Sequence, residues 1–213
     1  MMAPDAATAD QAYRTLKAHI MSARFPPGTM FNVHGLANEI GISITPVRDA
    51  MERLVGERLI TARAGGGFEM PQVSVETLSD LYLWNAFLLR TALSQAPAAG
   101  AQDGMVAFIE TVDPDDDAAL VDGTATLFLL LSQGARLCEH RAAVRSVNDR
   151  LQSVRFAERR LRDRKSELLR LATLSESGSL EALRNALSVY HRRRARHLPA
   201  ILDLLRAGPA VRI

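Results

Sequence analysis

The sequence predicts a mainly α protein in two parts, in which three helices and a β-hairpin precede an all-helical bundle. Apolar residues recur at helical spacing over most of the chain. The clearest strand signal is a pair of short apolar runs, 59–62 and 67–70, around a glycine-rich turn. From Val75 onward the pattern is helical throughout. We therefore expect a first domain over residues 1–72, a linker over 73–77 and an all-helical domain over 78–213.

The bulk composition is that of an ordinary globular protein. Its 213 residues suit one or two domains, and 47% hydrophobic with 23% charged residues is not the balance of a disordered chain. No apolar run approaches the roughly 18 residues that a membrane span needs, and the N-terminus shows no secretory signal. The single cysteine, Cys138, fits a reducing compartment. We expect a soluble, cytoplasmic protein that does not contact a membrane.

The first helix is expected over residues 7–22, where Ala12, Leu16 and Ile20 share one helical face. The prolines of the segment 25–28 end it, because proline can neither continue a helix nor donate a backbone hydrogen bond. Residues 29–31 are expected to form a short strand.

Two more helices follow before the hairpin. Asn32 is expected to cap the second helix, which ends at Gly41, a residue that tolerates the left-handed backbone of a sharp turn. Ser43 is expected to cap the third helix, over about 45–56, with Pro46 in its first turn, where a missing N–H costs nothing.

The second domain is expected to contain helices over about 77–99, 115–135, 137–172 and 179–207. Helix signals are weakest over 98–117, which is rich in Gly, Pro and Asp and is expected to hold one short helix near 106–112.

Three helices followed by a hairpin is the order of a winged helix-turn-helix, a fold that inserts the N-terminal end of its third helix into the major groove of DNA. Ser43, Ile44, Thr45 and Arg48 then face the nucleic acid, while a core-facing stripe holds Val47, Ala50, Met51 and Leu54. Arg48 can make a bidentate contact with guanine. The alternative is a plain core helix on which Arg48 is a solvated charge.

Net charge alone does not point to DNA. The chain carries +2, and residues 1–72 hold seven Lys or Arg against seven Asp or Glu. Because DNA binding usually needs a basic face, the prediction depends on where the cations lie.

The run 36–54, which reads LANEIGISITPVRDAMERL, resembles the DNA-binding domain of the GntR family, as do FPPG at 25–28 and the glycines of 65–67. The resemblance covers roughly residues 10–72. It implies a homodimeric repressor of a short palindromic operator, with contacts from His34, Ser43, Thr45, Arg48, Gly65 and Gly66. Ile44 stands where the family usually has a basic residue, and it offers a contact to a thymine methyl instead. Arg63 on the wing is expected near the minor groove or its phosphates.

Residues 78–207 resemble the helical effector domain of the FadR-type (FCD) branch, whose members often bind a metal through one aspartate and three histidines. The corresponding helix here is leucine-rich at 126–132, and Tyr190 stands at the last histidine position. His140, His191 and His197 are scattered in the sequence. We therefore expect no metal and no cofactor.

An effector site in the second domain is expected at Trp84, Asn85, Leu88 and Tyr190. Asn85 and Leu89 stand where the branch commonly has arginine and glutamate, so an apolar ligand, or none, fits better than a carboxylate held by metal and arginine. Plain core packing is the alternative for this aromatic segment.

The second domain also carries a strong concentration of arginines: Arg155, Arg159, Arg162, Arg192, Arg193, Arg194 and Arg196. Such a run is usually a solvated face with pairs such as Glu158 with Arg162. A second nucleic-acid contact or a carboxylate-bearing partner is the alternative.

No phosphate loop, nucleophile elbow or catalytic pair is present, so an enzyme is not expected. The sequence predicts a DNA-binding transcriptional regulator, a repressor by its resemblance, whose helical domain dimerises and is a candidate for binding a small effector. The rival hypothesis is a winged-helix interaction module that has lost specific DNA binding.

Overall fold

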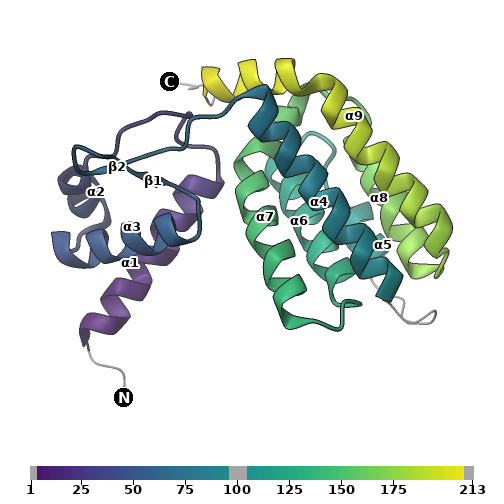
Figure 1. Ribbon diagram of the computed structural model, residues 1–213, viewed down its shortest axis with the longest axis horizontal. Coiled ribbons are helices and arrows are strands. Elements are labelled where there is room, and N and C mark those ends of the chain that lie inside the picture. The colour runs from purple at the N-terminus through teal and green to yellow at the C-terminus, as the bar shows by residue number, and fades with distance from the viewer. Residues whose placement is uncertain (1–3, 96–104, 209–213) are drawn as a thin grey trace. The chain divides into compact units, whose positions relative to one another are not determined.

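The computed structural model describes residues 4–95 and 105–208 (Figure 1). Two compact units make up the chain. The winged-helix unit comprises the described residues up to Val73 together with those from Asp203 onward, and the helical unit comprises Ser74–Leu202. The mainly α fold class expected from the sequence is confirmed, including its hairpin.

The winged-helix unit contains three helices and a two-stranded hairpin: α1 (Pro4–Met21), α2 (Val33–Ile40), α3 (Ile44–Gly56), β1 (Thr61–Ala62) and β2 (Phe68–Glu69). The strands are antiparallel, with Thr61 opposite Glu69. Residues 29–31, expected as a strand, run along β2 and form a single bridge between Met30 and Glu69.

One apolar core joins the elements of this unit. Its buried side chains come from every helix and from the hairpin: Ala12, Leu16, Ile20, Val33, Leu36, Ala37, Val47, Ala50, Met51, Leu54, Leu59, Ile60, Phe68 and Met70. The apolar face expected on α1 is therefore the face that α3 covers. Burial of these side chains is the main force that fixes α3 in place.

The helical unit contains α4 (Val75–Gln95), α5 (Met105–Thr111), α6 (Asp117–Ser132), α7 (Cys138–Phe156), the 3-10 helix η1 (Ala157–Arg160), α8 (Arg164–Glu176) and α9 (Leu180–Ala207), whose last turns belong to the winged-helix unit. Helices α4, α6 and α7 pack on one another, and α8 packs on α5 and α6 (Figure 1). The short helix expected near 106–112 is α5. The end of the helix expected over 77–99 lies outside the described residues.

Helix α4 begins at Val75, earlier than expected and inside the segment 73–77 that the sequence predicts to be a linker. Ser74 and Thr77 cap its first turn reciprocally: the Ser74 N–H donates to the Thr77 hydroxyl oxygen at 2.8 Å, and the Thr77 N–H donates to the Ser74 hydroxyl oxygen at 3.2 Å.

The single helix expected over 137–172 is wrong, because the chain breaks between α7 and α8. Leu161 has an extended backbone and Asp163 adopts a left-handed one at φ 57°. The break turns Glu158 of η1 inward, where it is 2% exposed and bonds Tyr82 and Arg194. A continuous helical pattern could not reveal this, because the partners of Glu158 lie on other helices.

Among the described residues, no helix has the combination of length and apolar character that crossing a membrane requires.

Candidate nucleic-acid interface

The turn between α2 and α3 sets the direction of the third helix. Gly41 has φ 76° and ψ 31°, and both its N–H and the Ile42 N–H donate to the Ala37 carbonyl, at 2.9 and 3.1 Å. A side chain at this backbone conformation is strained, so glycine is the residue that allows the tight turn.

The caps of the two helices differ. Asn32 caps α2 as expected, its side-chain oxygen accepting from the Gly35 N–H at 3.1 Å. Ser43 holds the N-cap position of α3 but makes no side-chain capping hydrogen bond, so the expected cap is wrong in that respect. The exposed Ser43 hydroxyl is left available for another partner.

Helix α3 has one buried and one exposed face, as expected. Val47, Ala50, Met51 and Leu54 are at most 2% exposed, whereas Ser43, Thr45 and Arg48 are exposed. Ile44 is half-buried and packs against the core of the unit. His34 is exposed on α2.

A polar brace ties α1 to the C-terminal end of α3. Tyr13 and Lys17 of α1 donate to the Glu57 carboxylate at 2.7 and 2.8 Å, and the Arg53 guanidinium stacks on the Tyr13 ring, 3.5 Å from its centroid. Burial opposes ionisation of Glu57, but the hydrogen bonds from Lys17 and Tyr13 hold the pKa of this carboxyl below its usual value. The brace adds charge-assisted bonds to the apolar packing of α3.

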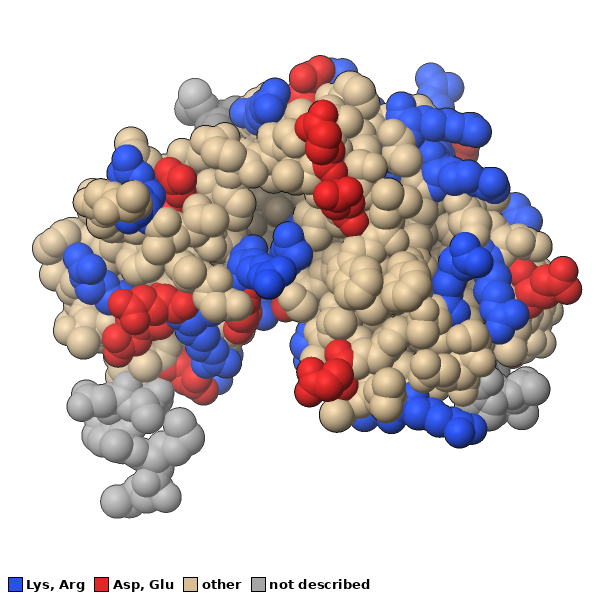
Figure 2. Space-filling model, viewed as in Figure 1, with Lys and Arg blue, Asp and Glu red and all other residues tan. Residues whose placement is uncertain are grey.

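Several oppositely charged side chains of the winged-helix unit form ion pairs with one another. Arg24 forms a bidentate pair with Glu39, with N–O distances of 2.6 and 2.9 Å. Arg53 pairs with Asp10 at 3.2 Å. Figure 2 shows Lys or Arg and Asp or Glu side chains interspersed on the visible face of this unit. Within the described part of the chain, no ion pair or hydrogen bond to another side chain engages Arg48.

The wing is an exposed loop between β1 and β2. Gly66 and Gly67 have φ of 89° and 85°, and an added Cβ at Gly65, Gly66 or Gly67 would meet open space. The Arg63 N–H donates to the Gly67 carbonyl at 3.1 Å, and the Arg63 guanidinium lies 3.4 Å from Glu69. The glycines therefore let a backbone edge project with no side chain in front of it.

The residues expected to bind an effector in the helical unit differ in exposure. Asn85, Leu88 and Tyr190 are buried, but Trp84 is 47% exposed and stacks on Phe87, with ring centroids 5.5 Å apart. Core packing therefore explains the buried residues of this segment but not Trp84, and the effector site stays a prediction. Trp84 and Phe87 instead form an exposed apolar face of α4 with Leu83.

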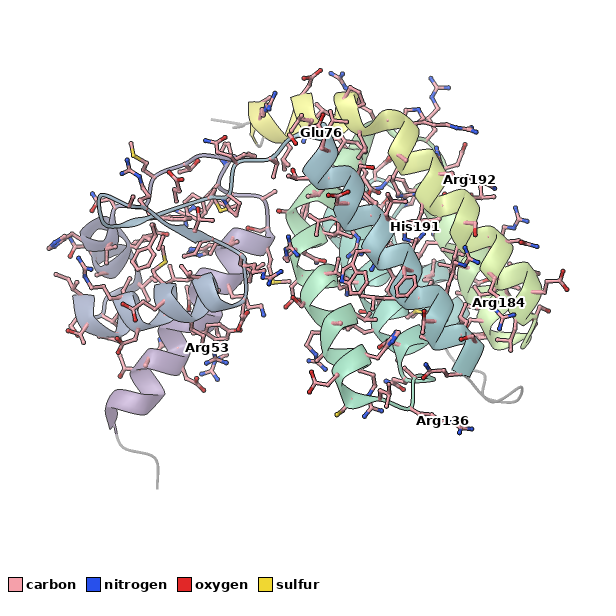
Figure 3. The ribbon with its side chains drawn as sticks, viewed as in Figure 1. Arg53, Glu76, Arg136, Arg184, His191 and Arg192 are labelled. Atoms are coloured by element: carbon pink, nitrogen blue, oxygen red, sulfur yellow. The ribbon has the colours of Figure 1, made fainter. Side chains whose placement is uncertain are left out.

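Two arginines expected on a solvated face are buried. Arg155 is 1% exposed and Arg194 is 2% exposed, whereas Arg192 lies on the outer side of α9 (Figure 3). Arg194 pairs with Glu158 at 3.0 Å and with Glu167 at 2.7 Å, so the pair expected between Glu158 and Arg162 is not formed.

The helical periodicity of α7 indicates that Arg155 is buried. Asn148 and Arg155 fall on the helical stripe of Val144, Val147, Leu151 and Val154, where a solvated residue is out of place.

Three features are typical of a winged-helix DNA-binding protein. Helices α2 and α3 meet at a turn that Gly41 allows. The exposed end of α3 carries Arg48, which no other described side chain engages, and the glycine-rich wing projects from the hairpin. The profile described as "Bacterial regulatory proteins, gntR family" matches residues 8–70. Residues 8–70 therefore match the DNA-binding domain of the GntR family, and the chain is similar to transcriptional regulators.

Similar proteins agree with this assignment. The Nta operon transcriptional regulator of Aminobacter aminovorans is 29% identical over 147 residues, which are 65% of this chain and 69% of that one. The HTH-type transcriptional repressor GlaR of Escherichia coli K12 is 28% identical over 96 residues, 45% of this chain and 44% of the repressor. In fold, the chain is similar to a GntR transcriptional regulator from Rhodococcus sp. RHA1, with a TM-score of 0.77, 16% identity and coverage of 90% and 97% of the two chains.

Proposed function

We propose that the protein is a repressor that binds a palindromic operator as a homodimer and reads each half-site with α3. The observation that carries this proposal is Arg48, which is exposed one turn into α3 and engaged by no other described side chain, although most cations around it are paired. A guanidinium in that position is free to bond a guanine edge.

The other contacts follow from exposure. Ser43, Thr45 and His34 offer hydroxyl or imidazole groups to phosphates, and the backbone at Gly65 and Gly66 can approach DNA closely. Ile44 contributes to the core and leaves only part of its side chain for a thymine methyl. Arg63 must exchange Glu69 for a phosphate to take part.

The experiment is selection of bound duplexes from a random pool, followed by titration of the selected duplex at fixed salt. We expect Arg48→Ala to weaken specific binding by about 10- to 100-fold, the discrimination of one bidentate base contact. Arg145→Ala, which removes an exposed arginine of α7, is the matched control and should leave the affinity unchanged. If wild type and Arg48→Ala bind the selected duplex with equal affinity, α3 does not read the operator sequence through Arg48.

The salt dependence separates this proposal from its rival. A regulator that contacts phosphates loses affinity steeply as salt rises, because each contact releases a condensed counterion. An interaction module without DNA binding would yield no selected duplex at all.

The homodimer is proposed to form through the helical unit, as the FadR-type branch of the family implies. A palindromic operator requires two reading helices, and one module makes too few contacts for tight binding. The exposed face of Leu83, Trp84 and Phe87 on α4 is the surface that we assign to the second copy. Figure 2 shows an uncharged area over α4.

In this proposal residues 1–72 read DNA, 73–77 connect the domains, and 78–213 dimerise and bind a small effector. The protein acts in the cytoplasm, where a bacterial operator is reached.

A further inference from the structure

Five arginines on the surface of the helical unit form no ion pair with a described residue. Arg192 and Arg196 belong to α9, and Arg159, Arg160 and Arg162 lie in η1 or directly after it. All five are exposed, and we call them the arginine cluster. Figure 2 shows Lys or Arg side chains gathered over the middle of α9.

Buried contacts hold the two segments of the cluster together. Arg194 of α9 pairs with Glu158 of η1 at 3.0 Å, and both are at most 2% exposed. One residue before it on α9, Arg193 donates to the Arg162 carbonyl. The arginines that follow Glu158 in sequence are therefore fixed beside the middle of α9.

Few acids oppose the cluster. Residues 182–202 contain five arginines and no Asp or Glu, and residues 159–163 contain three arginines and one acid, Asp163. The neighbouring carboxylates of Glu158 and Glu167 already pair with cations other than those of the cluster. The charge of the cluster is therefore available to a partner.

The cations of the cluster also repel one another. Arg192 and Arg196 are four residues apart on α9, a spacing at which like charges destabilise a helix. A partner that carries repeated negative charges relieves this repulsion at several arginines at once.

The winged-helix unit, in contrast, has few cations that are free to bond phosphates. Residues 1–72 hold seven Lys or Arg, and five of them lie in ion pairs: Arg14, Lys17, Arg24, Arg53 and Arg63. Affinity for the DNA backbone comes from cations that replace condensed counterions, so each of these pairs must open before it contributes. This difference favours DNA over an acidic protein as the partner of the unpaired arginines.

We propose that the arginine cluster binds the phosphate backbone of double-stranded DNA without reading its sequence. Guanidinium groups form paired, charge-assisted hydrogen bonds with phosphate oxygens, and a row of phosphates supplies the repeated negative charge that the cluster requires. The cluster is then a second DNA-binding surface besides α3 and the wing. That it strengthens operator binding rests on the proposed function; that it binds duplex DNA does not.

The test is titration of the full-length protein with a duplex of scrambled sequence at several salt concentrations. A triple glutamine variant removes three cations of the cluster: Arg160→Gln, Arg192→Gln and Arg196→Gln. Each lost phosphate contact lowers the slope of log K against log salt by about 0.9, so we expect a slope that is shallower by about 2–3.

The matched control is a second triple variant that removes three exposed arginines at the start of α7: Arg136→Gln, Arg141→Gln and Arg145→Gln. It makes the same change in net charge, so a difference between the two triple variants reports contact with DNA rather than total charge. We expect the control to keep the wild-type slope to within about half of one contact. Equal slopes of the two triple variants overturn the proposal.

Two further variants separate contact from folding. Arg160→Lys, Arg192→Lys and Arg196→Lys together keep the charges and are expected to keep the slope, so a loss as large as that of the glutamine variant overturns the proposal. Arg192→Gln alone is expected to melt at the wild-type Tm and to lower the slope by about 1. An unchanged slope in this single variant contradicts the contact of Arg192.

Poly-L-glutamate tests the other class of partner. We expect it to bind the protein more weakly than a duplex of equal charge. A glutamine triple variant that loses polyglutamate but keeps the duplex would assign the cluster to an acidic protein and overturn the proposal.

Arg48→Ala separates this proposal from the proposed function. We expect it to lose the preference for the selected duplex while keeping the salt slope on the scrambled duplex to within about one contact. A preference that survives in Arg48→Ala, with a slope that falls in the glutamine triple variant, overturns the reader and leaves the cluster. The reverse pair of results overturns the cluster and leaves the reader.

Discussion

Arg194 Nε donates to one carboxylate oxygen of Glu158 at 3.0 Å, and Nη2 forms an ion pair with the same oxygen at 3.0 Å, inside the helical unit. Tyr82 donates to the other carboxylate oxygen at 2.6 Å. Burial opposes ionisation of Glu158, but the Arg194 charge and these hydrogen bonds hold the pKa of its carboxyl below the usual value. Burial and the adjacent Glu158 charge raise the pKa of Tyr82 well above its ordinary value. The three side chains join α4, η1 and α9.

Arg194→Met is expected to lower the free energy of unfolding by about 3–5 kcal/mol, because Glu158 is left as a buried anion without its cation. Denaturant titration measures the change. Arg192→Met alters the exposed neighbour on α9 and should stay within about 0.5 kcal/mol of wild type. Equal stabilities of the two variants would show that the buried pair contributes nothing.

His191 is expected to make the stability depend on pH. Burial lowers the pKa of His191 from 6.5 to about 4. Between pH 4 and pH 6.5, His191 is therefore protonated in the unfolded chain but neutral in the folded protein. Stability from this residue is therefore complete above pH 6.5 and is lost as the pH falls toward 4, by about 3 kcal/mol at most. Denaturant titrations at pH 7, 6 and 5 measure it. His191→Gln should flatten the slope, and a slope unchanged in the variant contradicts the assignment to His191.

Phe87→Asp is expected to convert the dimer to a monomer of about 23 kDa, because a charge would be buried at the face proposed for the second copy. Light scattering at micromolar concentration distinguishes the two species. Leu137→Asp changes a side chain that is likewise exposed, at 62%, and should stay dimeric. A Phe87→Asp dimer would move the interface to another surface.

The purified protein is expected to hold no stoichiometric zinc, nickel or manganese. Among the described residues no group of three or more His, Cys, Asp or Glu side chains could hold a metal ion. His140 and His197 each bond a backbone carbonyl at 2.8 Å, and both ring nitrogens of His191 are engaged. Chelator should change neither the Tm nor the operator affinity. Elemental analysis that finds about one metal per chain after dialysis would disprove this expectation.

The winged-helix unit could be predicted from the sequence because local signals decide it. Pro26 and Pro27 follow soon after α1, which ends at Met21, Asn32 caps α2, and Gly41 permits the turn, and each of these signals is local. The spacing of the apolar residues on α3 identifies its buried face. Arg48 lies on the opposite face, so the sequence predicts that it is exposed. Local rules gave the hairpin as well, because consecutive glycines favour the positive φ of its loop.

The helical unit shows where such rules fail. Three features of this unit differ from what the residue types predict. The chain breaks between α7 and α8, Arg155 and Arg194 are buried, and Trp84 and Phe87 are exposed. An arginine is buried or solvated according to what lies on helices distant in sequence, as Glu158 does for Arg194. The sequence by itself determined the elements of the winged-helix unit and the buried and exposed faces of α3. Only the tertiary structure decided which charges are paired, because the free energy of a charge depends on its partners and its distance from water.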